Sequence, residues 1–586
     1  MHFVVGRLSS GAAATQAFDA DGAAVGDLIR HADDAALAGF VRHSSVVSPA
    51  ARWVWDDTAR WYPRLLRHGV RVARCHDLRL AHAILRLSTL AASSALAKSP
   101  HGVWDAAAEV ERPPTAHTTL FDVDVDPADD GADVPTDDVD ETVAEWRRHL
   151  DAVRGSSAPG RLRLLLAAES AGALIAVEMR AAGLPWSVDR HDAVLTEAVG
   201  PRPPVGARPA RMHDLVLAIR AALDDSTLNP DSPQELLRSL RRSGINASST
   251  SQWELREIEH PVIEPLLEYK KLARLLSANG WSWMEAWIVD GRFRPDYVPG
   301  GAATGRWATN GGGALQLPKQ VRSAVRADPG WKLVVADAAQ LEPRILAALS
   351  ADTAMAAAGR GTDLYAGIQA TGVVETRAHA KVAMLGAMYG ATTGESGRLL
   401  PRLARAYPRA IALVEDAART GERGESVTSW LGRSSPLPPP SWFDVQSLAS
   451  APDASESDER RARSSAREWG RFTRNFVVQS TAAEWALCWM AELRTALMAL
   501  PTGTDSDSHG AQASPGPLAG TVFDGRPHQV FFLHDEIVVH TPAPLADAVA
   551  EQVRLAAESA GRLLFGAFPV DFPLGAAVVD DYAEAK

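Results

Sequence analysis

The sequence predicts a multidomain α/β protein. Its 586 residues are enough for about three to five domains or subdomains, and 46% of them are apolar, an ordinary value for globular proteins. Helical periodicity dominates after about residue 142, whereas strand-like runs occur near the N-terminus, in the middle of the chain and near its C-terminal end. We find no internal repeats, which argues against a repeat architecture.

The N-terminal half begins with mixed signals and then becomes helical. Residues 80–97 have helical periodicity, and the acidic stretch 122–141, rich in Asp, Pro and Gly, is typical of a linker. A long helix is expected to end just before Gly183, because glycine is a favoured C-cap. Another is expected to begin after Ser232, since Ser followed by Pro and then by Glu235 resembles a capping box.

The C-terminal half combines helices with a few strands. An apolar strand is expected at 332–337, directly followed by a helix, and a hairpin with a tight turn at 534–535 is expected at 528–542. A long helix is centred on residues 375–390. Two stretches rich in Ser, Pro and Asp are interpreted as flexible insertions: 434–460 and 501–519.

Charge and cysteine content exclude several classes of protein. The formal net charge is −12, but 122–145 contains no Lys or Arg, whereas 269–344 is rich in both, so the chain can still present a basic groove to nucleic acid or, alternatively, a solvated face. Two cysteines are too few for a disulfide scaffold and fit a reducing, cytoplasmic setting. The N-terminus does not resemble a signal peptide, and no apolar run is long enough to span a bilayer.

Acidic residues at two predicted strand ends are candidate metal ligands. Asp337 ends the apolar strand, and Asp535 lies at the tip of the hairpin with Glu536 beside it. A carboxylate in such a place costs free energy unless it is paired, hydrogen-bonded or bound to metal. The ordinary alternatives are a helix N-cap for Asp337 and a turn-forming residue for Asp535. If the strands are neighbours, the two carboxylates can hold two divalent cations about 3.5–4 Å apart and support phosphoryl transfer.

Four residues at a spacing of four form a candidate nucleotide-binding helix face. Arg377, Lys381, Leu385 and Tyr389 share one face of the predicted helix and span about 18 Å along its axis. Two cations at one end can grip a triphosphate, and an aromatic ring at the other can stack on a base. The alternative is a solvated helix in which Leu385 and Tyr389 simply pack.

A second helix face carries polar residues at the same spacing. Arg471, Asn475 and Gln479 can reach hydrogen-bond acceptors in the minor groove, which every base pair presents. Such contacts would sense pairing geometry without reading sequence. The alternative is an exposed polar face without a ligand.

These patterns occur in segments whose order resembles that of the family A DNA polymerases, the bacterial DNA polymerase I type. The five segments are 303–318, 334–350, 377–390, 474–484 and 533–539. Upstream, three stretches resemble that family's thumb and its connection to the palm: 228–240, 260–275 and 290–297. The resemblance covers roughly residues 160–586 and implies a right-hand fold, with an antiparallel β palm and helical fingers and thumb. The domains it implies are an exonuclease-like domain with acidic linker at 1–141, connecting helices and thumb at 142–300, palm at 301–350 and 476–586, and fingers at 351–475.

The resemblance also implies roles for individual residues. The implied catalytic residues are Asp337, Asp535, Glu536 and Lys381. The implied metal ligands are Asp337, the Ala338 carbonyl and Asp535. Residues implied to bind the deoxynucleoside triphosphate are Gln340, Glu342, Tyr365, Arg377, Lys381, Leu385 and Tyr389. Residues implied to contact primer–template DNA are Arg306, Gln316, Arg471, Asn475, Gln479 and His534.

Several positions depart from the family pattern. Ala338 and Ala339 replace a usual Tyr and Ser, and Pro343 replaces a usual Leu. Leu385 stands where an aromatic residue normally packs on the incoming sugar, and Tyr365 stands at a usual His position. None of these changes removes a metal carboxylate, so we expect chemistry to survive and nucleotide affinity and sugar discrimination to change.

The N-terminal part resembles the 3′–5′ exonuclease domain of the same family, an α/β domain of ribonuclease H-like type, most clearly at 71–87. A working domain of that type needs four acidic ligands in three motifs, because its hydrolysis also uses two metals. The first strand lacks an Asp-x-Glu, and Asp77 matches a single position of the set. We therefore expect a degenerate, structural exonuclease-like domain, and no 5′-nuclease domain.

The expected function is DNA-directed DNA synthesis in repair or replication. The resemblance implies two Mg²⁺ ions, replaceable by Mn²⁺, primer–template DNA and deoxynucleoside triphosphates as partners, a monomeric state and a cytoplasmic, nucleoid-associated location. One alternative is a single-subunit RNA polymerase of the phage type, which Glu342 opposes because a bulky acid there should exclude ribose. The other is a non-catalytic DNA-binding protein with the polymerase fold, which the retention of Asp337 and Asp535 opposes.

Overall fold

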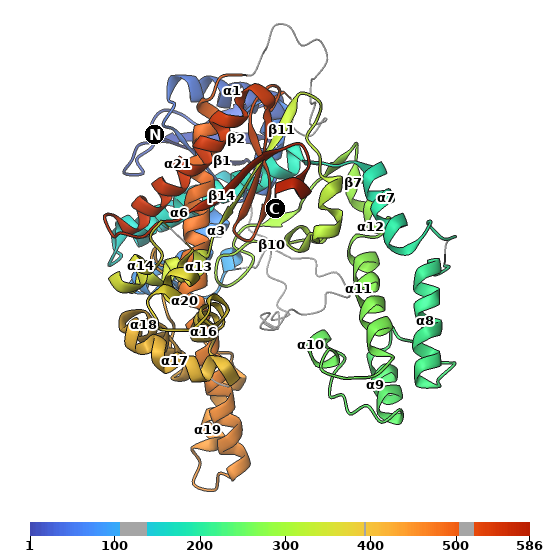
Figure 1. The fold of residues 1–586 in the computed structure, drawn as a ribbon. Coiled ribbons are helices and arrows are strands. Elements are labelled where there is room, and N and C mark those ends of the chain that lie inside the picture. Colours follow the sequence, from blue (N-terminus) through green and yellow to red (C-terminus); the bar gives the residue numbers. More distant parts are fainter. Residues whose placement is uncertain (106–136, 205, 362, 392–393, 503–520, 586) are drawn as a thin grey trace. The chain divides into compact units, whose positions relative to one another are not determined.

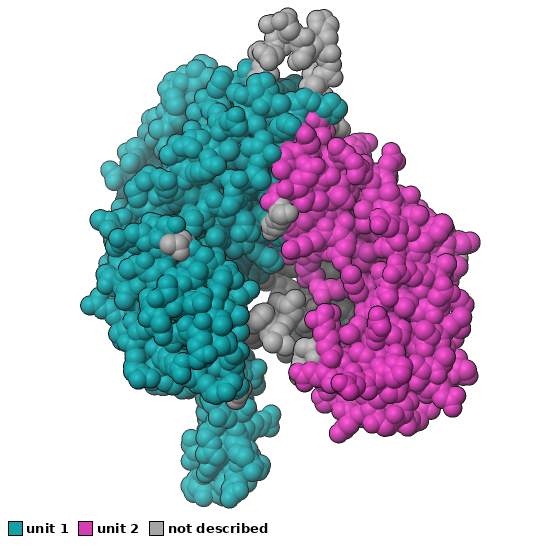
Figure 2. Space-filling view, in the orientation of Figure 1, with its two compact units in different colours: residues 1–183, 295–311, 329–578 teal, residues 184–294, 312–328, 579–586 magenta. Residues whose placement is uncertain are grey.

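The chain forms two compact units, each assembled from three separate segments (Figure 2). The computed structural model describes residues 1–105, 137–204, 206–361, 363–391, 394–502 and 521–585. Unit 1 consists of Met1–Gly183, Pro295–Gly311 and Pro329–Val578, and unit 2 of Leu184–Arg294, Gly312–Asp328 and Val579–Lys586. Both units are therefore discontinuous in sequence.

Unit 1 begins with a five-stranded mixed sheet in the order β3-β2-β1-β4-β5. β1 pairs antiparallel with β2 and parallel with β4, and β4 pairs parallel with β5. Val4, Phe18, Val54 and Leu78 form a core with Trp104 and Trp146, which joins the sheet to the helices that cover it. The strands are β1 (His2–Arg7), β2 (Ala13–Phe18), β3 (Ile29–His31), β4 (Arg52–Trp55) and β5 (Cys75–Asp77). The helices of this part are α1 (Asp34–Val47), α2 (Thr58–Arg67), α3 (Leu78–Leu87), α4 (Ala95–Lys98), α5 (Val139–Arg154) and the 3₁₀ turns η1 (Thr89–Ala91) and η2 (Val103–Asp105).

Three long helices run through unit 1: α6 (Pro159–Ala182), α20 (Glu456–Ala499) and α21 (Ala546–Phe565). α20 packs against both α6 and α21 (Figure 1). Gly183 ends α6 with a φ of 73°, as predicted. Where α20 meets the N-terminal part, the buried Arg494 donates to Glu178 at 2.7 Å and to the Val72 carbonyl at 2.6 Å. Tyr62 donates to the same carboxylate at 2.5 Å, so one charged network joins three elements.

A second sheet in unit 1 has the order β12-β13-β11-β14. The predicted strand and hairpin are both present: β11 (Trp331–Ala338) pairs antiparallel with β13 (Glu536–Pro542), which pairs antiparallel with β12 (His528–Leu533). β14 (Leu574–Val579) lies at the other edge. The helix expected after β11 is α13 (Leu341–Leu349), with Pro343 in its first turn, where a missing N–H costs little. A two-stranded sheet pairs β9 (Tyr297–Val298) with β10 (Ala308–Thr309), and the turn η5 (Ala543–Leu545) follows β13.

The remaining helices of unit 1 correct one prediction. Residues 434–460 are not a flexible insertion, because they contain α19 and the start of α20. Trp442 of α19 is buried, and the capping box of Ser455 and Asp458 starts α20, signals that the Ser- and Pro-rich composition obscured. Most of 501–519 lies outside the described residues. The helices are α14 (Thr353–Ala358), α15 (Leu364–Ala370), α16 (Arg377–Tyr389), α17 (Gly394–Ala406), α18 (Pro408–Glu422) and α19 (Pro440–Ala449).

Unit 2 is mostly helical. Ser232 caps α9 as predicted, accepting from the Glu235 N–H. A three-stranded sheet orders β6-β8-β7, and Tyr582 packs in the unit's core with Arg322 stacked on its ring. The helices are α7 (Val188–Val199), α8 (Ala210–Leu223), α9 (Pro233–Arg242), α10 (Gln252–Leu255), α11 (Ile263–Asn279), α12 (Trp281–Trp287), η3 (Ala314–Gln316), η4 (Lys319–Ala324) and η6 (Tyr582–Ala585). The strands are β6 (Leu184–Pro185), β7 (Ile288–Val289) and β8 (Arg292–Phe293).

Candidate active site

The second sheet brings the predicted acidic residues together. Asp337, next to last in β11, lies opposite Glu536 of β13 in the register of the two strands. The Ala338 N–H donates to the Asp535 carbonyl at 3.0 Å, which fixes the turn between β12 and β13 against the end of β11. His534 in this turn has a φ of 60°, a conformation that a tight hairpin requires. Asp337 at the end of β11 and Asp535 in the turn before β13 are far apart in sequence, but the pairing of the two strands brings them together.

The two aspartates repel each other. Burial, and then the charge of Asp337, raise the pKa of Asp535 to about 6. The alternative assignment of Asp337 as a helix N-cap is wrong, because Gln340 holds the N-cap position of α13, with a φ of 50°. A cation bound beside the two carboxylates would offset this repulsion and favour the ionised form of Asp535.

Glu342 lies at the centre of a hydrogen-bonded cluster beside this pair. Its carboxylate accepts from the Tyr389 hydroxyl at 2.5 Å and pairs with Arg306. Burial and the charge of Glu342 raise the pKa of Tyr389, so its hydroxyl remains a donor, and Gln479 of α20 hydrogen-bonds to the same tyrosine. Predicted residues from four segments thus meet here.

The helix α16 places its predicted residues along one face, as expected from their spacing. Arg377 and Lys381 are exposed, and Leu385 is half-buried. Arg377 donates to Asp363 at 2.7 Å and lies over the ring of Tyr365, with 5.7 Å to its centroid. The cationic end of this face is therefore tethered to α15.

Asp363 is a site residue that the sequence analysis missed. Gln340 donates to the same Asp363 oxygen at 3.0 Å that Arg377 contacts, and the other oxygen caps α15 through the Ala366 N–H. The sequence does carry the capping signal, an Asp directly before a helical run. The ion pair with Arg377 has no such signal, because it depends on how α15 and α16 pack.

The polar face of α20 lies next to α16. Arg471 is exposed, and Asn475 and Gln479 are half-buried. Neighbouring Arg474, which the sequence analysis did not single out, is buried and donates to the Ala387 carbonyl of α16 and to Glu415 of α18, both at 2.7 Å. Arg474 thus fixes the rotation of α20 that turns its polar face toward Tyr389.

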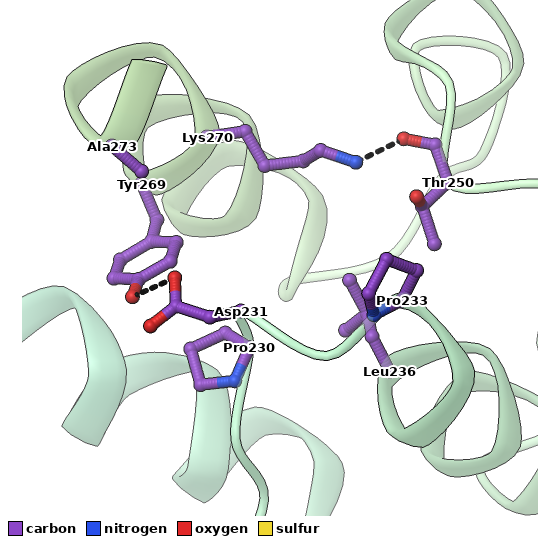
Figure 3. A pocket seen from close by; sticks show the side chains of 8 residues that line it. All are labelled: Pro230, Asp231, Pro233, Leu236, Thr250, Tyr269, Lys270 and Ala273. Carbon is purple, nitrogen blue, oxygen red and sulfur yellow. Dashed lines mark hydrogen bonds between the residues drawn. The ribbon is translucent and has the colours of Figure 1, made fainter. Parts of the chain in front are cut away.

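One predicted residue belongs to the other unit. Gln316 is in η3 of unit 2, whereas the other predicted site residues belong to unit 1. No predicted site residue lines the cavity of about 170 Å³ in unit 2 or the cavity of about 290 Å³ in unit 1. Figure 3 shows the smaller one, in which Lys270 donates to the Thr250 carbonyl and Tyr269 to Asp231 at 2.6 Å. At least one lysine of the basic stretch therefore has a structural partner.

Comparison with known proteins identifies the family. The model of DNA polymerase family A matches residues 209–578, so the chain belongs to this family. It is 31% identical over 174 residues to DNA polymerase I of Chloroflexus aurantiacus, covering 26% of this chain and 18% of that protein. It is 25% identical over 376 residues to the thermostable DNA polymerase I of Thermus thermophilus, covering 59% and 39% of the two. The chain thus spans well under half the length of these curated relatives.

A solved structure shares the fold over nearly the whole chain. It is the polymerase domain of Pol1 from M. smegmatis, in complex with DNA primer–template and dNTP, with a TM-score of 0.63 at 18% identity. The match covers 98% of this chain and 93% of that one. Among the described residues, no helix is both long and apolar enough to cross a membrane.

Proposed function

We propose that this protein is a DNA-directed DNA polymerase that transfers deoxynucleoside monophosphates to a primer 3′-hydroxyl. The observation that carries the proposal is the meeting of Asp337 and Asp535 at the ends of paired strands, where each disfavours the other's charge. Carboxylate oxygens in such a pair suit Mg²⁺, for which Mn²⁺ can substitute. Asp337, Asp535 and the Ala338 carbonyl would hold the metal ions, which would lower the pKa of the attacking hydroxyl and neutralise the leaving pyrophosphate.

The chain's own residues orient the substrates. Arg377 and Lys381, exposed on α16, are placed to bind the triphosphate, with Gln340 and Tyr365 beside them. Tyr389 closes the other end of that face at the template base, and Glu342, held by two partners, occupies the space that a ribose 2′-hydroxyl would need. Selection of deoxynucleotides follows from this fixed carboxylate.

Primer–template DNA is the proposed partner of the second polar face. Arg471, Asn475 and Gln479 share one face of α20 and would donate to the minor groove, and Arg306 and His534 lie near Glu342 and would also contact the DNA. Glu536, buried beside Asp535, adds negative charge close to the proposed metal site. We propose that the protein acts in repair or replication and as a monomer.

The test is primer extension with Mg²⁺ by the wild type and by Asp337→Asn, Asp535→Asn and Asp547→Asn. We expect both site variants to lose about 1,000-fold or more of the extension rate, about 4 kcal/mol of transition-state stabilisation. Asp547 is exposed on α21, so its variant should keep wild-type activity. Primer–template binding in a gel-shift assay shows that the variants are folded. Extension by Asp535→Asn at the wild-type rate would refute the mechanism.

We also propose that the N-terminal sheet is an exonuclease-like domain without nuclease activity. The acids at its strand ends already have structural partners: Asp56 accepts from Trp61 at 2.7 Å, and Asp77 accepts from the Thr58 and Leu80 N–H groups. β1 itself carries no acidic residue. Single-stranded DNA incubated with Mg²⁺ or Mn²⁺ should stay intact; degradation that persists in Asp535→Ala and disappears in Asp77→Asn would disprove this.

A further inference from the structure

A buried cluster of two histidines and one glutamate lies in the N-terminal part of unit 1, outside the site described above. His82 is on α3, and Glu145 and His149 are on α5. The spacing of four between Glu145 and His149 puts both on one face of α5. The side chains of His82, Glu145 and His149 are only 6%, 0% and 1% exposed. Side chains of these types are seldom buried together without a shared partner.

The three side chains converge on one point. Oε1 of Glu145 lies 2.6 Å from Nδ1 of His82 and 2.8 Å from Nε2 of His149. One potential ligand atom from each residue lies within 4.8 Å of the other two. A metal ion with bonds of about 2.0–2.2 Å to each atom fits between them after a small outward movement of the side chains.

Neighbouring side chains contact the atoms of His82, His149 and Glu145 that face away from the point of convergence. Nε2 of His82 faces Asp105 Oδ1 at 3.3 Å, and Nδ1 of His149 faces Nε2 of His76 at 3.1 Å. The second Glu145 oxygen pairs with Nε of Arg148 at 2.9 Å. In metal-binding histidines, the ring nitrogen that faces away from the metal is usually hydrogen-bonded in this way, and this hydrogen bond fixes the orientation of the ring.

We propose that His82, Glu145 and His149 bind a Zn²⁺ ion. Two imidazoles with one carboxylate are a zinc ligand set, whereas Mg²⁺ and Ca²⁺ prefer oxygen ligands alone. A water molecule would complete the tetrahedron. Because His82 and Glu145 are 63 residues apart in sequence, the ion would close a long loop and clamp α3 to α5. The competing explanation is a metal-free hydrogen-bonded triad that holds the same two helices.

The first test is the zinc content of the full-length protein, purified from zinc-supplemented medium without a histidine tag and measured by mass spectrometry. We expect about one zinc ion per chain in the wild type and less than about a tenth of that in His149→Ala and Glu145→Gln. Asp535→Asn should retain the zinc, which separates this site from the carboxylates of the polymerase site. His43→Ala is the matched control, since His43 is exposed on α1. Wild-type protein without zinc would overturn the proposal.

The second test remains valid even if a ligand variant fails to fold. Wild-type protein treated with a chelator is titrated with Co²⁺, and the visible absorption of tetrahedral cobalt is recorded. We expect saturation at about one equivalent and displacement of the band by Zn²⁺. The chelator should also lower the melting temperature of the wild type but not that of His82→Gln, a conservative variant. Absence of the cobalt band together with an unchanged melting temperature would establish the metal-free triad instead.

Discussion

Tyr389 donates a 2.5 Å hydrogen bond to Oε2 of Glu342, while Arg306 pairs with the other carboxylate oxygen. A glutamate held from both sides cannot swing away from a bulkier sugar. We predict that Glu342→Ala raises the ratio of ribonucleotide to deoxynucleotide incorporation by roughly 10- to 100-fold, the range that a small steric change in a pocket can produce. Tyr389→Phe, which removes one anchor, should raise it less. Single-nucleotide extension measures both, with exposed Glu551→Ala as control; an unchanged ratio in Glu342→Ala would exclude this role.

The half-buried Leu385 lies one helical turn before Tyr389 on α16, on the face that we propose to bind the incoming nucleotide. We expect Leu385→Phe to lower the KM for deoxynucleotides by about 2- to 10-fold, the equivalent of one added aromatic contact. The tighter sugar pocket should also lower the ratio of dideoxy to deoxy incorporation. Leu385→Met, which preserves size without a ring, should behave like the wild type. If the ratio is the same in all three proteins, Leu385 does not contact the sugar.

If Arg377 binds the triphosphate of a nucleotide, it must first give up its ion pair with Asp363. Because the pair is largely exposed, its loss should have only a small effect on the stability of the fold. Asp363→Asn keeps the cap on α15 but frees Arg377, so we expect the KM for nucleotide to fall by about 2- to 5-fold. Asp352→Asn changes a similar helix cap on α14 and serves as control. A KM that rises in Asp363→Asn would show that Asp363 orients Arg377 rather than competing for it.

Glu484 of α20 is fully buried, and burial raises the pKa of its carboxyl group to about 7. The hydrogen bonds that it accepts from the Ser429 hydroxyl and the Leu431 N–H act in the opposite direction and lower this pKa. A carboxyl group whose pKa is higher in the folded than in the unfolded state stabilises the fold below about pH 4.5, and this contribution is lost as pH rises through about 7. We predict that, between about pH 5 and pH 8, the wild type loses about 3 kcal/mol more unfolding free energy than Glu484→Gln. Urea unfolding at both pH values measures the difference, and equal losses in the two proteins would contradict the assignment.

Arg494 is buried between Glu178 and the backbone carbonyls of Val72 and Ala73. Arg494→Met leaves buried acceptors without a donor and should cost about 3–5 kcal/mol of stability. Exposed Arg554→Ala, which removes only a surface pair with Glu551, should cost less than about 1 kcal/mol. Thermal unfolding compares the three proteins. A melting temperature of Arg494→Met equal to that of Arg554→Ala would mean that the network contributes little.

Local sequence patterns could predict those residues of the candidate site whose spacing matches the period of a single helix or strand. Arg377, Lys381, Leu385 and Tyr389 share a face of α16 because four residues make about one turn, and the alternation of the hairpin located Asp535. For Asp363 the sequence carries only a helix-capping signal, and its ion pair with Arg377, like the contacts of Arg474, depends on packing angles between helices that no local pattern encodes. The helix α19 was not predicted because the Ser- and Pro-rich composition around it obscured its local signals, although its Trp442 is buried.

Unit 2 is completed by a segment that is synthesised late. Its core residue Tyr582 donates its backbone N–H to Val325, and the Ala327 N–H donates to Asp580. While the ribosome is still making unit 1, the helices of unit 2 therefore lack their closing segment. The turn η4 is the part of unit 2 that packs against this segment, and a nascent chain stalled before residue 579 would leave the Val325 carbonyl and the Ala327 N–H without these partners.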